Sequence, residues 1–167
     1  DLEELGPVAL TVDCDILNAD GGTRCASITA ASMALRLAVR RLIASGECMP
    51  KDKRLSRDEI RKGATQESLT QEEMAEHELS VMPDDVAALS VGMVEGGVWT
   101  DLDYVLDSNA DVDMNVVMTS SGQFVEVQGT GEEATYSREE FEALVDAAVS
   151  GISKINEIQS KILSVAI

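Results

Sequence analysis

Aromatic side chains and basic side chains are both scarce in this sequence of 167 residues. Two Phe, two Tyr and one Trp leave an aliphatic core, although the apolar content of 44% is ordinary for a globular protein. Thirteen Lys and Arg stand against 31 Asp and Glu, so the formal net charge is -18 at pH 7. Because neutralising nucleic-acid phosphates requires Lys and Arg, this charge argues against binding nucleic acid over the whole surface.

Long apolar runs and metal-type cysteine spacings are also missing. The apolar runs are too short and too interrupted to cross a bilayer, so we expect a soluble, cytoplasmic protein with no membrane partner. The three cysteines, Cys14, Cys25 and Cys48, have no zinc-like spacing, and no signal peptide opens the sequence, which predicts reduced thiols. Cys14 is predicted to be a small core residue. The single histidine, His77, stands between two glutamates and is predicted to be solvated.

The most informative stretch places a glycine pair, a hydroxyl and a guanidinium between a predicted strand and a predicted helix. Residues 8–16 alternate apolar and polar side chains, as in a half-buried strand. Apolar residues at helical spacing predict a long amphipathic helix over residues 26–46. Gly21-Gly22 permits a tight turn, and the first N–H groups of a helix carry partial positive charge.

The next two side chains of this stretch suit an anion. Thr23 can donate a hydrogen bond, and the planar guanidinium of Arg24 can bind two phosphate oxygens. The spacing is neither a P-loop nor a dinucleotide-binding fingerprint. From the spacing alone, a plain turn with a solvated Arg24 stays open as an alternative to an anion site.

A second stretch, residues 107–115, has an oxygen-bearing side chain at every second position. Mg²⁺ is commonly held by one or two protein carboxylates together with water and substrate phosphate. An EF-hand calcium loop is excluded, because Val112 replaces the required glycine and Met118 replaces the bidentate glutamate. A solvated turn capped by Asp and Asn side chains is the competing interpretation.

The polar stretch 47–85 predicts two short helices, each opened by a capping box, Ser56 to Glu59 and Thr70 to Glu73. Neither has enough apolar residues for a strong core face, so we interpret the stretch as a mobile, partly helical insertion. Six Lys and Arg residues fall between positions 51 and 62, but acidic residues are interspersed, which favours a solvated helix face over contact with an RNA backbone.

Strand patterns dominate after residue 85, and a helix closes the sequence. A third capping box, Ser137 to Glu140, opens a helix whose apolar spacing continues to the end, with Gly151 either dividing it or allowing close packing. Glu126 and Gln128 share one strand face, and cross-strand pairing is favoured for them over packing near the site. The predicted strands are residues 86–94, 98–106, 114–119 and 124–128, the last two forming a hairpin.

Four runs, in matching order, resemble the ribonuclease PH family of phosphate-dependent 3′ exoribonucleases, which trim tRNA precursors. They cover most of the sequence outside residues 47–84, and so many ordered matches leave no serious room for chance. The runs are 12–29 (VDCDILNADGGTRCASIT), 89–94 (LSVGMV), 102–119 (LDYVLDSNADVDMNVVMT) and 124–137 (FVEVQGTGEEATYS).

The resemblance implies an α+β fold that corresponds to the C-terminal part of ribonuclease PH. Residues 1–46 would supply a strand and a long helix that complete a first lobe like ribosomal protein S5 domain 2, residues 47–85 an insertion or linker, and residues 86–167 the C-terminal α/β domain. In the family, about half of the polypeptide precedes this point, including an arginine-rich helix. We therefore expect a fragment, a cleaved product or a split subunit that is weakly active or inactive without a separate N-terminal half.

The resemblance also assigns site residues. Gly22, Thr23 and Arg24 would bind inorganic phosphate as co-substrate, and Asp107 and Asp113 would be catalytic residues that hold Mg²⁺. Phosphate would attack the 3′-terminal phosphodiester and release a nucleoside diphosphate, so no side-chain nucleophile is needed. Catalysis would rest on positioning and charge neutralisation.

One departure from the family and one alternative function stay open. Family members usually carry acidic residues where this sequence has Val105 and Leu106, which leaves no further metal ligand assigned beside the two aspartates. The partners implied are RNA, at the 3′ end of a tRNA precursor, and identical subunits in a hexameric ring of dimers. The alternative is a non-catalytic subunit of an exosome-like ring, kept for assembly or for the RNA path, or an inactive fragment.

Overall fold

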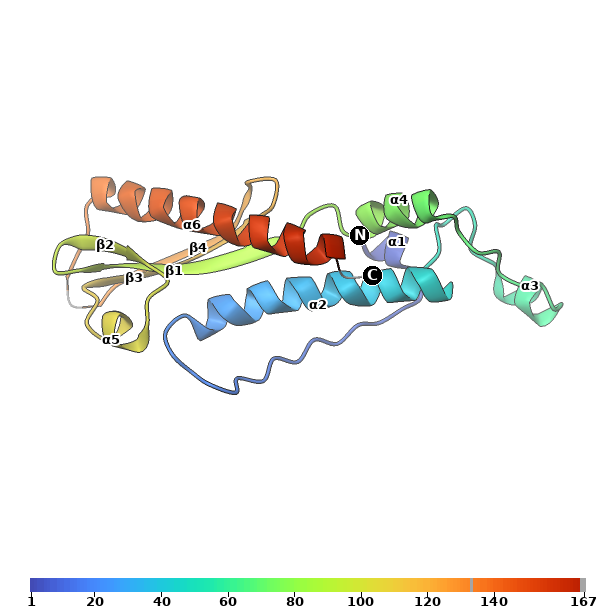
Figure 1. Ribbon diagram of the computed structural model, residues 1–167, viewed down its shortest axis with the longest axis horizontal. Coiled ribbons are helices and arrows are strands. Elements are labelled where there is room, and N and C mark those ends of the chain that lie inside the picture. Colours follow the sequence, from blue (N-terminus) through green and yellow to red (C-terminus); the bar gives the residue numbers. More distant parts are fainter. Residues whose placement is uncertain (133, 166–167) are drawn as a thin grey trace. The chain divides into compact units, whose positions relative to one another are not determined.

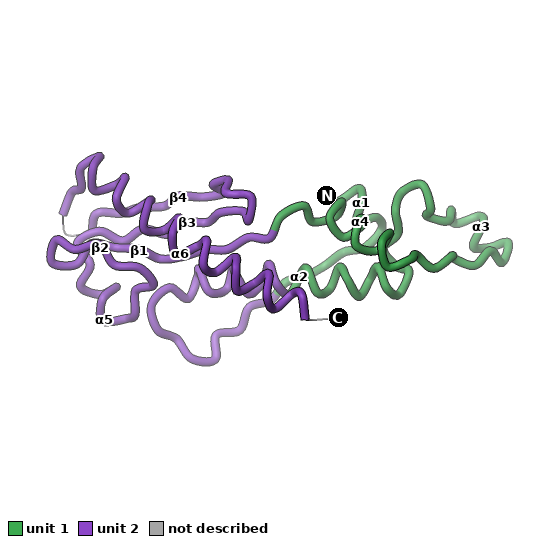
Figure 2. Tube along the Cα trace, turned by 45° about the horizontal axis from the view of Figure 1, so that its top comes forward, with its two compact units in different colours: residues 1–12, 34–84 green, residues 13–33, 85–167 purple. Residues whose placement is uncertain are grey.

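The computed structural model describes residues 1–132 and 134–165, which divide into two compact units (Figures 1 and 2). Unit 1 combines Asp1–Val12 with Ala34–Asp84, and unit 2 combines Asp13–Met33 with Asp85–Ile167. The long helix α2 (Thr23–Ser45) contributes residues to both. It begins three residues before the predicted start and ends where predicted. The three-part division at residues 46 and 85 stays a prediction.

Unit 2 is built on one antiparallel sheet of four strands in the order β2-β1-β3-β4, which confirms the α+β class. The predicted strand over 98–106 is wrong beyond Thr100. The Asp103 side chain accepts a hydrogen bond from the Leu106 N–H and caps a short helix there instead. The elements of unit 2 are β1 (Val86–Val94), β2 (Gly97–Thr100), α5 (Tyr104–Asp107), β3 (Val112–Thr119), β4 (Phe124–Gly131) and α6 (Arg138–Val165).

Helices cover both faces of this sheet. On one face, the alternating β1 residues Ala87, Leu89, Val91 and Met93 pack with β3 and with buried side chains of α6, which runs along the sheet in Figure 1. On the other face, side chains of β1 and β3 pack against the first turns of α2. Burial on both faces explains why β1 is a nearly continuous apolar run rather than an alternating one.

The predicted hairpin and the final helix are confirmed. β3 and β4 pair in antiparallel register, and the Ser137 capping box is formed with Glu140. The helix α6 continues through Gly151, where a Cβ atom would lie 2.2 Å from Cδ2 of Leu89. This glycine therefore allows close packing of the helix on the sheet and does not divide the helix.

Unit 1 is helical and has its own core. It contains α1 (Leu2–Leu5), α3 (Arg57–Arg61) and α4 (Gln71–Val81), and both predicted capping boxes are formed. The expectation of a weak core face is wrong for α4, because Val81 is buried and Met74 is partly buried against residues of α2 that belong to this unit. The core cluster of unit 1 is Leu5, Val39, Ile43, Cys48 and Val81.

The prediction of a solvated His77 is wrong. Its ring lies on the buried face of α4 and is 3% exposed, although both neighbours in the sequence are glutamates. One of them, Glu78, forms ion pairs with Arg36 (3.3 Å) and Arg40 (2.8 Å) of α2. Nε2 lies 3.4 Å from Sγ of Cys48, and Nδ1 lies 3.9 Å from Oε2 of Glu4. Burial lowers the pKa of His77, the opposing effect of the Glu4 carboxylate being smaller.

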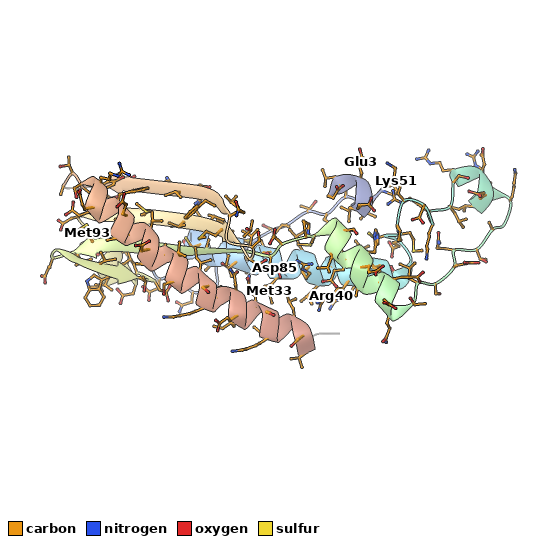
Figure 3. All side chains as sticks on the ribbon, turned by 90° about the horizontal axis from the view of Figure 1, so that it is seen from above. Glu3, Met33, Arg40, Lys51, Asp85 and Met93 are labelled. Carbon is orange, nitrogen blue, oxygen red and sulfur yellow. The ribbon has the colours of Figure 1, made fainter. Side chains whose placement is uncertain are left out.

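The basic cluster of residues 51–62 has two parts. Residues of α3 are exposed, as the predicted solvated helix face requires. The residues before α3 bind unit 1 itself: Lys51 forms an ion pair with Glu3 at 3.1 Å, and both are labelled in Figure 3. Arg54 donates hydrogen bonds to the carbonyl oxygens of Glu4 (2.9 Å) and Met49 (2.8 Å), and Lys53 pairs with a glutamate of α4.

The predicted strand over residues 8–16 is wrong for this chain. Residues 9–20 are exposed and form neither helix nor strand. A strand requires a hydrogen-bonded neighbour, and within residues 1–132 and 134–165 the four strands pair only with one another. Cys14 is consequently exposed rather than part of a core, whereas Cys25 and Cys48 are buried, and all three are free thiols.

Membrane insertion by a helix finds no support in the part of the chain that is described. None of the helices there combines the length and the apolar composition needed to cross a bilayer.

Candidate active site

The sheet face that α2 approaches carries a patch of polar side chains. On β3, side chains alternate: Val112 and Met114 point into the α6 core, so Asp113 and Asn115 point to the α2 side. The strand register places their cross-strand neighbours on the same side. We call this patch the polar sheet face; its residues are Ser90 of β1, Asp113 and Asn115 of β3, and Glu126, Gln128 and Thr130 of β4.

The glycine pair brings the start of α2 close to this face. A Cβ atom on Gly21 would lie 1.9 Å from the Leu102 carbonyl oxygen. Gly22 has a φ of +67°, and a Cβ atom there would lie 3.0 Å from the Ser90 hydroxyl oxygen. The Asp20 carboxylate accepts hydrogen bonds from the N–H groups of Tyr104 and Gly21 and fastens the turn to the loop after β2. Only glycine allows this approach.

The N-terminus of α2 is capped differently from the shorter helices. Side chains of Ser56, Thr70 and Asp103 cap α3, α4 and α5. In α2, the Gly22 carbonyl accepts the first helical hydrogen bond, from Ala26 at 3.0 Å, so the capping position has no side chain. The N–H groups of the first turn have no acceptor within the helix, which makes this end of a 23-residue helix suited to an anion.

Arg24 points across to the sheet. Its Nη2 donates to both carboxylate oxygens of Glu126, at 3.0 and 2.9 Å, and this hydrogen bond and charge raise the pKa of Arg24. The assignment of Glu126 to cross-strand pairing is wrong, since its partner comes from the helix layer. Glu126 and Gln128 are two positions apart, which places their side chains on the same face of the strand. Nothing in the sequence indicates which helix lies over that face.

Cys25 lies beneath the first turn of α2 and is not a nucleophile. Its side chain is buried, and Sγ donates to Oδ1 of Asn115 at 2.9 Å. Burial raises the pKa of this thiol to about 11, a change that the Arg24 charge opposes and the Asp113 charge adds to. The thiol is therefore protonated at neutral pH. The influence of Arg24 and Asp113 on one thiol also indicates that both predicted motifs reach the same region.

The two aspartates interact electrostatically. Asp107 is the last residue of α5, and Asp113 lies near the start of β3 between Gly92 and Thr130 of the neighbouring strands. Burial is the main cause that raises the pKa of Asp113, followed by the charges of Asp107 and Glu132. A cation between the carboxylates would remove this repulsion.

The intervening residues of the acidic stretch have a structural role. The Asn109 amide and the Ser108 hydroxyl donate hydrogen bonds to the Val105 carbonyl oxygen, at 2.7 and 3.2 Å. The capped-turn interpretation thus describes Ser108 and Asn109, while Asp107 and Asp113 are the pair that interact through their charges. Within residues 1–132 and 134–165, no three His, Cys, Asp or Glu side chains gather to hold a metal. Two carboxylates still suit Mg²⁺, which keeps several waters.

Comparison with known proteins shows what the sheet unit is similar to. Residues 84–151, which include the whole sheet and the first half of α6, match the family model described as 3′ exoribonuclease family, domain 2. Over 164 residues, 98% of its length, the chain is 44% identical to proteins named ribonuclease PH from Bacillus cereus (strain AH820) and Bacillus anthracis (strain A0248). The chain is therefore similar to a C-terminal portion of ribonuclease PH, which confirms the resemblance. It spans 55% of the length of these relatives.

Proposed function

We propose that the polar sheet face and the start of α2 form part of the active site of a phosphorolytic 3′-to-5′ exoribonuclease that trims the 3′ ends of tRNA. The observation that carries this proposal is the convergence of an uncapped helix N-terminus, Arg24 and Asp113 on one face of one sheet. Similarity to proteins named ribonuclease PH supports the choice of reaction.

In the proposed reaction, inorganic phosphate is both the nucleophile and a bound ligand. The Thr23 hydroxyl, the Arg24 guanidinium and N–H groups after Gly22 hold it beside the RNA terminus. A phosphate oxygen attacks the phosphorus of the 3′-terminal nucleotide, and the bond from that phosphorus to the preceding 3′ oxygen breaks. A nucleoside diphosphate is released, and the freed 3′ oxygen takes up a proton. The protein supplies positioning and charge neutralisation, so the protonated Cys25 has no chemical step.

Asp107 and Asp113 are the residues that would hold Mg²⁺. Carboxylate oxygens are ligands that Mg²⁺ accepts, and the raised pKa of Asp113 supports the fit. Burial is the first cause of that raised pKa and the Asp107 charge the second, and a divalent cation would offset both. When bound, the ion supplies neutralisation of phosphate charge. The proposed partners are RNA and further copies of the chain in a ring of dimers. A separate polypeptide that supplies the N-terminal part of the enzyme is the third proposed partner.

The test is phosphate-dependent release of nucleoside diphosphates from an RNA 3′ end. The assay uses the 167-residue chain, alone and reconstituted with the N-terminal part of a ribonuclease PH relative. Asp107→Asn and Asp113→Asn should each lower turnover at least about a hundredfold with the fold intact by circular dichroism. Asp146→Asn removes the same charge from an exposed position on α6 and should leave turnover unchanged.

Two results would contradict the proposal. Undiminished turnover in the aspartate variants would remove the site assignment. RNA binding by the reconstituted wild-type protein without any phosphorolysis would instead favour a non-catalytic subunit that contributes to an RNA path.

A further inference from the structure

The ion pair between Arg24 and Glu126 has a consequence for anion binding. Arg24 lies in the first turn of α2, and Glu126 is the least exposed residue of β4, whose other residues are all exposed. The fold brings them together across 102 positions of sequence, with a single nitrogen, Nη2, between both carboxylate oxygens. A carboxylate therefore occupies part of the guanidinium to which phosphate is expected to bind.

Within unit 2, Arg24 is the basic residue that does not belong to α6. The other Lys and Arg residues of unit 2 are Arg138, Lys154 and Lys161, and all three belong to α6, which packs on the opposite face of the sheet. Asp113 adds negative charge to the sheet face that α2 covers, and it interacts electrostatically with Asp107. Glu126 thus cancels the charge of the side chain on which a bound anion would most depend.

The exposure of the ion pair allows an anion to displace the Glu126 carboxylate from Arg24. The side chains of Arg24 and Glu126 are 49% and 40% exposed, so the carboxylate can turn to water without leaving a buried charge behind. Exposed ion pairs of this kind contribute little net stability. Phosphate brings more negative charge and more acceptor oxygens than one carboxylate, and it also gains the N–H groups at the start of α2.

A purely supportive role for Glu126 is the competing interpretation. Holding the guanidinium in one orientation would spare phosphate part of the cost of ordering a flexible side chain. The same carboxylate would then stay within a few ångströms of a phosphate that carries one to two negative charges. At a separation shorter than a Debye length this repulsion is only partly screened, so it opposes the gain from ordering.

We propose that Glu126 is an internal competitor for the Arg24 guanidinium, which inorganic phosphate must displace, and that it thereby sets the phosphate affinity of the site. This inference rests on the proposed function, because it assumes that phosphate binds at Arg24. It assigns to Glu126 a control of affinity and no contact with the reacting atoms.

The experiment measures binding of inorganic phosphate to the 167-residue chain by isothermal titration at constant ionic strength. Glu126→Gln keeps the shape and a hydrogen-bonding oxygen but removes the charge, and it should bind phosphate about five- to tenfold more tightly than the wild type. Glu157→Gln removes the same charge from an exposed position on α6 and should change affinity by less than about twofold. In the double variant Arg24→Ala with Glu126→Gln, the gain should disappear.

The possible results separate this inference from the proposed function. Phosphate that binds the wild type through Arg24 but binds Glu126→Gln no more tightly overturns the competitor role alone. Weaker binding by Glu126→Gln overturns it in favour of the supportive role. Absence of phosphate binding in the wild type and in Glu126→Gln, with both folded, overturns the phosphate site and the competitor together. Tighter binding by Glu126→Gln that persists without Arg24 also overturns the inference.

Discussion

The two units of this chain carry charge in different ways. Unit 1 has nine Lys and Arg against thirteen Asp and Glu, whereas unit 2 has four against eighteen. In unit 1 several of the charged side chains are paired with one another or with carbonyl groups, as for Lys51 with Glu3 and for Arg54. In unit 2 several carboxylates lie around the polar sheet face with Arg24 as the cation, which is paired with Glu126.

This difference teaches that the net charge of -18 describes neither unit well. The basic cluster of residues 51–62 partly stabilises unit 1 itself, since Lys51, Lys53 and Arg54 bind neighbouring segments. The acidic excess belongs to the unit that holds Asp107 and Asp113, where it favours a divalent cation. Phosphate affinity would therefore depend on local donors and on the cation, and little on the overall charge.

Burial of a titratable group also has opposite consequences in the two units. Burial lowers the pKa of His77 in unit 1 and raises the pKa of Asp113 in unit 2. Both shifts favour the neutral form. Acidification therefore works against unit 1 and in favour of unit 2, and pH can be used to separate their stabilities.

The largest expected effect concerns the core of unit 2. Ile152 is 1% exposed and packs between α6 and the sheet, so Ile152→Ala should lower the free energy of unfolding by about 2–5 kcal/mol. Chemical denaturation measures the loss, and hydrogen exchange locates it in β1 and β3. Ile158→Ala, at a 56% exposed position of the same helix, should cost far less. Equal loss of protection in the α4 amides of unit 1 would show that the two units do not unfold separately.

The next effect tests unit 1 through His77. Its pKa is lowered in the folded state, so the unfolded chain binds the proton more readily, and stability falls as the pH drops below the ordinary value of 6.5. From pH 7.5 to pH 5, the α4 amides should lose protection, expressed relative to the intrinsic exchange rate at each pH, while the α6 amides show no parallel loss. His77→Gln should remove most of this dependence. A dependence that persists in the variant would point to another group.

Much of the fold follows from local sequence signals. Capping boxes at Ser56, Thr70 and Ser137 and the apolar run of β1 predict elements that the structure contains, because hydrogen bonds and burial within a few residues decide them. The strand predicted over residues 8–16 fails for a non-local reason. Its alternation is real, but a strand also needs a neighbour, and none of the described strands pairs with it.

The site divides in the same way. The turn at Gly21 and Gly22 and the acidic stretch are recognisable in the sequence, and the register of β3 follows from its alternation. The partner of Arg24 is not recognisable, because Glu126 is brought to it by the stacking of a helix on a sheet. The sequence does not indicate the buried pair of His77 and Cys48, because a glutamate on each side of His77 makes this stretch of α4 look polar.

A smaller effect of opposite sign is expected in unit 2. The pKa of Asp113 is raised in the folded state, so the folded chain binds the proton more readily than the unfolded chain. Stability therefore falls as the pH rises from the ordinary value of 3.8 through the raised pKa. Asp113→Asn should therefore raise the melting temperature at pH 7, by about 1–3 °C, and have little effect near pH 3. Asp146→Asn on α6 is the matched control for loss of one charge. Lower stability of Asp113→Asn at pH 7 would contradict the repulsion inferred around this carboxylate.

The smallest effect is expected where unit 1 has its most exposed ion pair. Lys51 and Glu3 are 3.1 Å apart, but their side chains are 69% and 81% exposed, so water and salt screen the attraction and ordering two flexible side chains offsets much of it. Lys51→Gln should shift the melting temperature by less than about 2 °C at physiological salt. Arg54→Gln is the informative counterpart, because it removes donors from the Glu4 and Met49 carbonyl groups and should destabilise unit 1 clearly more. If the two variants were equally destabilised, the distinction between screened pairs and structural donors in unit 1 would fail.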